Sequence, residues 1–216
     1  ALQEVESWPE NGGPSMQIDF LAQLVGVQVI LGPTVQRDTG HYGNAILTRL
    51  PILDVRRLNL AVDGRQPRGA LDVDLDAGGA RLRLIATHLG LRPSERRAQV
   101  KKLLASLSAD SAHAHDFIVL VGDINEWFMI GRPLRWLHAH FGESPARRTF
   151  PSRWPILALD RIWVHPKTAL QRFDAFRSAD ARVASDHLPV RAELSLVRQP
   201  PALRPFTEEE PIPMAR

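Results

Sequence analysis

The order of apolar and polar positions along the chain predicts more strands than helices. The strongest strand is the apolar run at residues 117–121, rich in β-branched and aromatic side chains, which ends abruptly at Gly122. Alternating apolar positions at 70–76 and 82–86, joined by Gly78-Gly79, predict a hairpin whose first strand exposes its acidic residues to solvent. Further strands are expected at residues 27–31 (closed by Gly32-Pro33), 43–48, 53–60, 157–164, 172–177 and 189–196.

Apolar residues at helical spacing predict three helices, around residues 18–25, from 93 to 107 and over 127–141. The second helix carries four basic side chains that we expect on a solvated face: Arg96, Arg97, Lys101 and Lys102. Because strands outnumber helices about two to one and several strands pair as hairpins, the pattern predicts an α/β fold with largely antiparallel sheets.

Chain length and terminal composition predict one domain followed by a tail. The chain of 216 residues is long enough to enclose a substantial core, and we expect a single domain over residues 1–198. Residues 199–216 are rich in Pro and Glu, which predicts a tail without packed structure. Leu2 and Val5 bracket polar residues as in the interior of an element, so we expect the domain to be N-terminally truncated, with its first strand missing.

Composition restricts the chemistry that the chain can perform. Without cysteine it has no disulfides, no thiol catalysis and no cysteine-ligated metal. Arginine dominates the 27 basic residues and suits phosphate, while a net charge of +3 is too small to require nucleic acid. No apolar run is long enough to span a bilayer, and no basic region followed by an apolar core opens the chain, so we expect a cytoplasmic protein and, by default, a monomer.

Polar side chains with catalytic chemistry stand at the ends of several predicted strands. They are His88, Asp123 with Asn125, Asp160, and Asp186 with His187, and Glu4 has a similar apolar setting. Each has a simpler interpretation: Asp123 and Asn125 as a strand-capping turn, Asp160 as the partner of Arg161. Taken together, these residues indicate the chemistry of phosphate-ester hydrolysis.

Hydrolysis of a phosphate ester at neutral pH needs a hard cation, an activated water and relief of charge on the phosphate oxygens. Carboxylates are ligands of Mg²⁺ and Mn²⁺, and a histidine oriented by a second carboxylate can act as a base. A Ser-His-Asp hydrolase is the main competitor, but the sequence has no G-x-S-x-G elbow. It has no P-loop and no G-x-G-x-x-G motif either, which disfavours nucleotide-cofactor chemistry.

Six motifs in a fixed order resemble the endonuclease/exonuclease/phosphatase superfamily, and the small bacterial members of undefined substrate are most similar. The motifs are Leu2-Gln3-Glu4-Val5, Gly43-Asn44-Ala45-Ile46-Leu47, Thr87-His88-Leu89, Gly122-Asp123-Ile124-Asn125, Leu159-Asp160-Arg161-Ile162 and Ser185-Asp186-His187-Leu188-Pro189. The resemblance covers nearly the whole chain up to about Leu196. It implies the deoxyribonuclease I-like fold, a four-layer α/β sandwich of two packed, mainly antiparallel sheets flanked by helices.

The resemblance also implies a role for each motif residue. Glu4 and Asp186 would hold Mg²⁺ or Mn²⁺, while Asp123 and Asn125 would contact the attacking water and the phosphate. His187 would be the general base or a phosphate-stabilising group, oriented by Asp160. Three further residues would contact the substrate phosphate or its surroundings, namely His88, Asn44 and Arg68.

The expected function is therefore metal-dependent hydrolysis of a phosphate ester, most simply a phosphodiester. Nucleic acid, a phospholipid headgroup and a small phosphodiester are all candidate substrates. Short loops between the predicted core strands favour a small or lipid substrate over duplex DNA. The alternative is a non-catalytic binding or scaffolding protein that retains the hydrolase fold.

Overall fold

The computed structural model describes residues 1–7, 16–37, 40–109 and 115–197, and the predicted tail at 199–216 lies outside these ranges. The elements in chain order are β1 (Leu2–Ser7), α1 (Met16–Val25), β2 (Gln28–Arg37), β3 (Gly40–Thr48), β4 (Ile52–Asn59), β5 (Gly69–Asp76), β6 (Arg81–His88), α2 (Pro93–Ala109), β7 (Phe117–Asp123), α3 (Arg132–Phe141), β8 (Asp160–His165), η2 (Lys167–Ala169), β9 (Leu170–Ala175), α4 (Ala181–Ala184) and β10 (Val190–Leu194). Within the described ranges, no helix is both long and apolar enough to cross a membrane.

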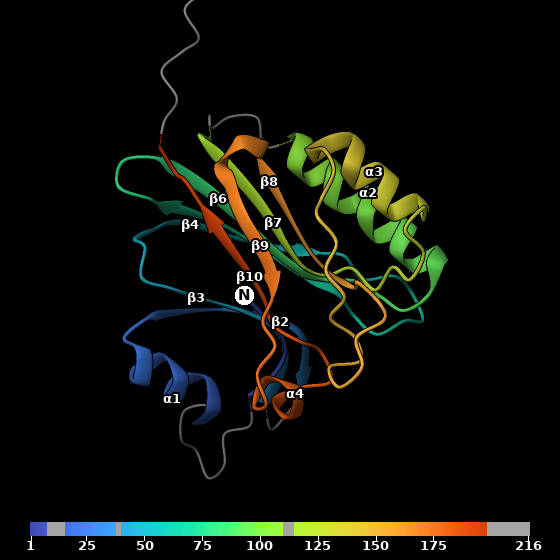
Figure 1. The fold of residues 1–216 in the computed structure, drawn as a ribbon, viewed down its shortest axis with the longest axis horizontal. Helices are drawn as coiled ribbons and strands as arrows, with labels where there is room; N and C mark the ends of the chain where they lie inside the picture. The colour runs from blue at the N-terminus through green and yellow to red at the C-terminus, as the bar shows by residue number, and fades with distance from the viewer. Residues whose placement is uncertain (8–15, 38–39, 110–114, 198–216) are drawn as a thin grey trace, which may run out of the picture.

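A five-stranded sheet forms the centre of the fold, with the order β4-β5-β6-β7-β8 (Figure 1). Its pairs are antiparallel except β6 with β7, which are parallel and connected through α2. Helices α2 and α3 cover one face, where Leu103 and Leu137 pack against the sheet residues Ile85 and Leu120. Strand β7 is buried on both faces, which explains its uninterrupted apolar sequence.

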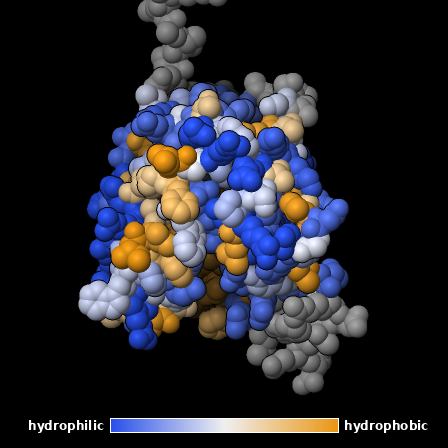
Figure 2. Space-filling view, turned by 90° about the vertical axis from the view of Figure 1, so that its right-hand side faces the viewer, coloured by the Kyte–Doolittle hydropathy of each residue, from blue (hydrophilic) through white to orange (hydrophobic). Residues whose placement is uncertain are grey.

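Two smaller sheets pack against the other face of the central sheet. Their orders are β1-β3-β2 and β10-β9. Ile46 and Phe173 from these sheets meet Val73 and Val119 of the central sheet in a shared apolar core. Helix α1 lies outside β1 and β2, so helices flank the packed sheets on both sides (Figure 1). The predicted four-layer α/β sandwich is confirmed. From the side on which α2 and α3 lie, the surface is mainly hydrophilic with separate apolar clusters (Figure 2).

The predicted solvated face of the hairpin is wrong. Asp72 and Asp74 of β5 are fully buried, and they accept hydrogen bonds from Arg56 and from Arg83 and Arg81 respectively. Alternation with a period of two shows only that the two faces of a strand differ. Here the polar face is enclosed as well, and cross-strand arginines satisfy the buried carboxylates.

Two predicted element boundaries differ from those in the structure. Strand β2 continues through Gly32-Pro33 to Arg37, because β2 is the edge of its sheet and an edge strand tolerates a residue without an N–H. The third helix begins at Arg132 rather than at residue 127, with Pro133 in its first turn. Residues 127–130 therefore form a separate exposed segment.

Candidate active site

Three neighbouring strands place their polar end residues in one row. Across the parallel pair β6–β7, His88 stands opposite Asp123, and across the antiparallel pair β7–β8, Asp123 stands opposite Asp160. Residues directly opposite each other in a sheet project from the same face, so the three side chains converge. All three are buried.

Gly122 permits this arrangement because no side chain fits at its position. Its φ is +142°, and a Cβ would lie 1.8 Å from the carbonyl oxygen of Thr87 in β6. After Asp123 the chain turns, and the Asn125 N–H donates to Asp123 Oδ1 at 2.8 Å. The turn that gave these two residues a simpler interpretation is therefore present. It also directs the Asn125 amide to His88 Nε2 at 3.0 Å.

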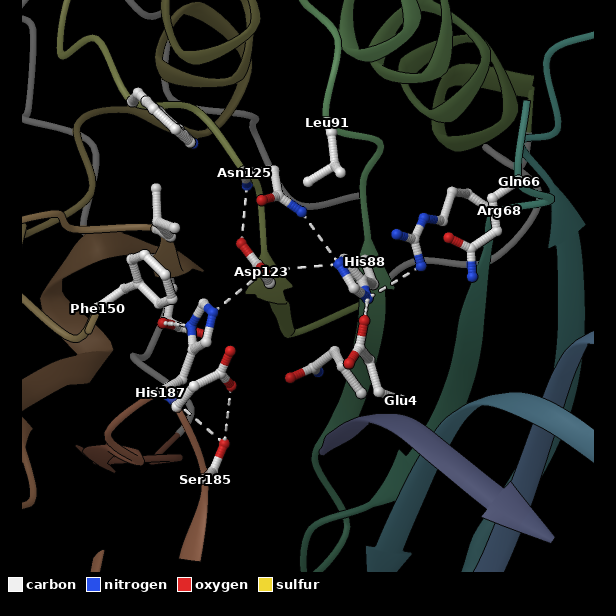
Figure 3. Close-up of a pocket in the computed structure, with 15 residues that line it drawn as sticks. Glu4, Gln66, Arg68, His88, Leu91, Asp123, Asn125, Phe150, Ser185 and His187 are labelled. Atoms are coloured by element: carbon white, nitrogen blue, oxygen red, sulfur yellow. Dashed lines mark hydrogen bonds and ion pairs between the residues drawn. The ribbon is translucent and has the colours of Figure 1, made fainter. Parts of the chain in front are cut away.

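His187 lies between two carboxylates. Its Nδ1 is 2.9 Å from Asp160 Oδ2, and its Nε2 is 3.9 Å from Asp123 Oδ2 (Figure 3). The ring of Phe150 packs against the imidazole, with 4.8 Å between the ring centroids. His187 comes from the loop before β10, so the second sheet layer supplies the group that joins the two aspartates of the first.

Burial and the charges of neighbouring side chains set the protonation of His187 and Asp123. Burial lowers the pKa of His187, but the hydrogen bond to Asp160 and the charges of Asp160, Asp123 and Asp186 outweigh burial and raise that pKa to about 8. Burial and the charge of Asp160 raise the pKa of Asp123 to about 6, against the opposing effect of His187. At pH 7 the imidazole of His187 is therefore protonated and Asp123 is mostly ionised.

Arg68 and His88 form a second pair of interacting polar side chains in the site. Arg68 Nη1 lies 3.2 Å from His88 Nδ1. Burial, followed by the charges of Arg68 and His187, lowers the pKa of His88 to about 3, so this ring is neutral at pH 7. The Nε of Arg68 is buried and has no hydrogen-bond partner among the described residues. A buried unpaired guanidinium N–H is costly unless a ligand satisfies it, and an anion such as phosphate does so.

Glu4 faces the same space from β1. A register shift interrupts the pairing of β1 with β3 between Leu2 and Val5, and Glu4 has a φ of 58°. Within the described residues, the non-glycine residues with positive φ are Glu4 and Asn125, and both line the site. Such strained conformations occur where the surroundings fix a side chain for a purpose. Glu4 Oε1 lies 3.8 Å from His88 Nδ1.

A cavity of about 380 Å³ joins these groups (Figure 3). Eight of the nine predicted residues line it: Glu4, Arg68, His88, Asp123, Asn125, Asp160, Asp186 and His187. The ninth, Asn44, lies outside the lining. Its buried amide donates to the carbonyl of Gly69 at 3.1 Å and so supports the backbone next to Arg68.

The structure adds residues to the nine that were predicted for the site. Leu91, Trp127 and Phe150 line the cavity from three different loops. Tyr42, the chain's one tyrosine, interacts with Glu4 and Arg68, and burial followed by the Glu4 interaction raises the pKa of Tyr42 to about 12. Its place directly before the motif that begins at Gly43 is the signal that could have identified it.

Arg96 corrects a prediction. Instead of lying on a solvated helix face, Arg96 is buried and its Nε donates to Glu126 Oε2 at 3.2 Å. Glu126 Oε1 in turn accepts the N–H of Phe128, and Arg96 also donates to the carbonyl of Leu91. A helical position can point toward a neighbouring loop, which a one-dimensional pattern does not reveal. The pair fixes the loop after His88 relative to the loop after Asp123.

The donor set suits a hard cation held by few protein ligands. Within the described residues, no group of three or more His, Asp or Glu side chains could hold a metal ion. Glu4 and Asp186 nevertheless expose carboxylates to the cavity. Mg²⁺ uses one or two carboxylates, completing its shell with water and substrate phosphate oxygens. The residues therefore suit a hard divalent cation rather than a closed structural metal site.

Comparison with known proteins is consistent with this geometry. A family model described as “Endonuclease/Exonuclease/phosphatase family” matches residues 1–187. YbhP of Escherichia coli (strain K12), an uncharacterized protein, is 32% identical over 200 residues, which are 89% of this chain and 76% of YbhP.

Solved structures share the fold at low identity. The mannosyl-6-phosphatase Bt3783 of Bacteroides thetaiotaomicron VPI-5482 superposes with a TM-score of 0.70 at 17% identity, over 83% of this chain and 81% of that one. The human Nocturnin catalytic domain, solved with a bound sulfate anion, gives a TM-score of 0.65 at 20% identity, over 84% of this chain and 76% of its own. At these identities the likeness concerns the fold alone.

Proposed function

The chain belongs to the endonuclease/exonuclease/phosphatase family, and from this premise we propose that it hydrolyses phosphate esters, chiefly phosphodiesters, with Mg²⁺ or Mn²⁺ as cofactor. The observation that carries the proposal is the arrangement of Asp160, His187 and Asp123 in one cavity with the unpaired guanidinium N–H of Arg68. An anion receptor thus lies beside groups able to take up and supply a proton.

Substrate phosphate would bind between the Arg68 guanidinium and the Asn125 amide. Arg68 offers the N–H that lacks a partner, and Asn125, whose amide donates to the carbonyl of Leu89 and lies 3.0 Å from His88 Nε2, lines the same cavity. A bound Mg²⁺ or Mn²⁺ would add positive charge at the phosphate oxygens, and Glu4 and Asp186 are the residues that would hold it. His88, which is neutral, would contribute hydrogen bonding beside Arg68 rather than a positive charge.

Protonation favours Asp123 over His187 as the acceptor of the water proton. A ring held between two carboxylates keeps its proton, so His187 is a cation that stabilises negative charge developing on the phosphate. Asp123 has a raised pKa of about 6, which makes it a stronger base than an ordinary aspartate while it remains ionised at pH 7. In the reaction, water attacks phosphorus and Asp123 receives its proton. The bond from phosphorus to the leaving oxygen breaks with its electron pair on that oxygen, which takes a proton from solvent.

The test uses bis-p-nitrophenyl phosphate with Mg²⁺, with Mn²⁺ and with a chelator. We expect metal-dependent release of p-nitrophenol, reduced by about 10²-fold or more in Asp123→Asn and in His187→Ala. Asp174→Asn is the matched control, because Asp174 lies on β9 in an ion pair with Arg172 outside the cavity. Wild-type protein that binds phosphate but releases no product with either metal would refute the proposal and favour a non-catalytic binding protein.

A further inference from the structure

Four consecutive apolar side chains are exposed beside the cavity. Trp127, Phe128, Met129 and Ile130 are 58%, 67%, 55% and 83% exposed, respectively. They occupy the segment between Asn125 and the start of α3, so no regular element buries any of them. Soluble proteins scatter single apolar residues on their surface, whereas a contiguous exposed group marks an interaction site.

A second loop, which lines the same cavity through Phe150, exposes further apolar side chains. Trp154 and Ile156 are 81% and 65% exposed. Arg161 connects the two loops, since its Nη2 contacts the sulfur of Met129 and its Nε donates to the carbonyl of Ala158.

A third loop adds Leu91, which is 67% exposed and lines the cavity together with Trp127. We call this set the apolar rim: Leu91, Trp127, Phe128, Met129, Ile130, Trp154 and Ile156. Figure 2 views the side of the molecule on which α2, α3 and these loops lie, and it shows apolar clusters near a hollow.

Exposed arginines accompany the apolar rim. Arg92 follows Leu91, Arg132 stands two residues after Ile130, and Arg153 precedes Trp154. All three are exposed, and in the part of the chain that the structure describes none forms an ion pair with a carboxylate. The surface around the cavity mouth is therefore both apolar and positively charged, with cations available to an external anion.

We propose that the apolar rim docks on an anionic lipid bilayer and presents the cavity to the phosphate ester of a membrane lipid. The proposal rests on the proposed phosphodiesterase function and specifies its substrate class. Tryptophan and other large apolar side chains enter the boundary between headgroups and acyl chains, while arginine pairs with lipid phosphates in the same layer. A bilayer satisfies both parts of this surface at once.

A lipid surface fits better than a protein partner. Non-obligate protein interfaces are about as polar as the remaining surface and offer many hydrogen-bonding groups. The apolar rim instead consists of consecutive large apolar side chains on turns, accompanied by arginines and no exposed acidic residue at positions 127–135 or 145–157. Because Leu91 and Trp127 line the cavity, a bilayer that binds the apolar rim would also lie at the cavity mouth.

The experiment measures binding of the full chain to sedimenting vesicles. One set contains phosphatidylcholine alone, and the other contains about one-third phosphatidylglycerol. We expect binding to the anionic vesicles that weakens with salt. The double variant Phe128→Ser/Ile130→Ser should weaken the partition coefficient at least about tenfold, because each side chain loses most of its transfer from water. Neither residue lines the cavity.

Matched variants separate the two contributions. Leu53→Ser removes a leucine that is 53% exposed on β4, at the far edge of the central sheet, and should leave vesicle binding unchanged. Arg132→Gln and Arg153→Gln should each weaken binding about fivefold at low salt. Lys167→Gln, which removes an exposed charge at η2, should have little effect.

Turnover of a soluble substrate distinguishes this proposal from the one on which it rests. The double variant should retain wild-type kcat/KM on bis-p-nitrophenyl phosphate while it loses activity on a phosphodiester lipid in vesicles. Soluble turnover without vesicle binding overturns the docking surface alone, and vesicle binding without any turnover overturns the hydrolase alone. Equal vesicle binding by the wild type and the double variant also overturns the docking surface. A wild-type dimer that the double variant converts to a monomer overturns it as well, because the apolar rim would then bind a second copy of the chain.

Discussion

Asp160→Asn tests whether Asp160 holds His187 in its protonated form. The substitution keeps the size of the side chain and removes its charge from the partner 2.9 Å away from His187 Nδ1. Asp160 opposes the effect of burial more strongly than Asp123 or Asp186 does, so loss of its charge should bring the pKa of His187 from about 8 to about 6.5. That difference corresponds to about 2 kcal/mol of interaction between the two side chains.

Two consequences follow for activity and stability. At pH 7.5 the protonated fraction of His187 should fall from about three-quarters to about one-tenth, so kcat should drop about eightfold from the charge alone. A raised pKa stabilises the folded protein fully below the unfolded-state pKa and loses this effect as pH rises through the folded-state pKa. The stability difference between wild type and variant should therefore be largest below about pH 6.5 and should vanish above about pH 8.

The assay is an NMR titration of the His187 imidazole in both proteins, together with urea unfolding at pH 6 and pH 9. Asp174→Asn serves as the control, because its exposed carboxylate pairs with Arg172 on β9 and should change neither quantity. A His187 pKa that stays near 8 in Asp160→Asn would refute the assignment, since another group would then hold the proton.

Three further predictions address protonation, the backbone and the buried charges. If His187 acts as a cation, activity on a soluble diester should fall above about pH 8 as the ring deprotonates, whereas a plateau to higher pH would restore His187 as the base. Gly122→Ala should lower the free energy of unfolding by about 3 kcal/mol or more in urea denaturation. The control is Gly64→Ala, where φ is also positive but the added Cβ meets open space, and its loss should be clearly smaller. Equal losses would contradict the steric explanation. Asp72→Ala removes the carboxylate that accepts two hydrogen bonds from buried Arg83, and it should lower the free energy of unfolding by about 3–5 kcal/mol in the same assay. A loss under about 1 kcal/mol would contradict this expectation.

Local sequence was informative where one physical requirement dominates a segment. The apolar run before Gly122 predicts a buried strand because only a central strand needs apolar side chains on both faces. It was less informative at Arg96, whose charge predicts solvent exposure, because the compensating Glu126 lies 30 residues away. The helix predicted over 127–141 rests on the spacing of Leu134 and Leu137, which does not indicate where the helix begins, and the structure begins it at Arg132.

The sequence by itself determined the α/β class, the family and the residue types of the site, because strand periodicity, turn residues and the order of motifs are local properties. Tertiary structure decided how these parts meet. Strand register aligns His88, Asp123 and Asp160, and a loop from the other sheet layer inserts His187 between the two aspartates. Protonation and exposure were decided there too, since a pKa depends on burial and on charges distant in the chain. The same holds for the apolar rim, which exists because three loops converge at one cavity.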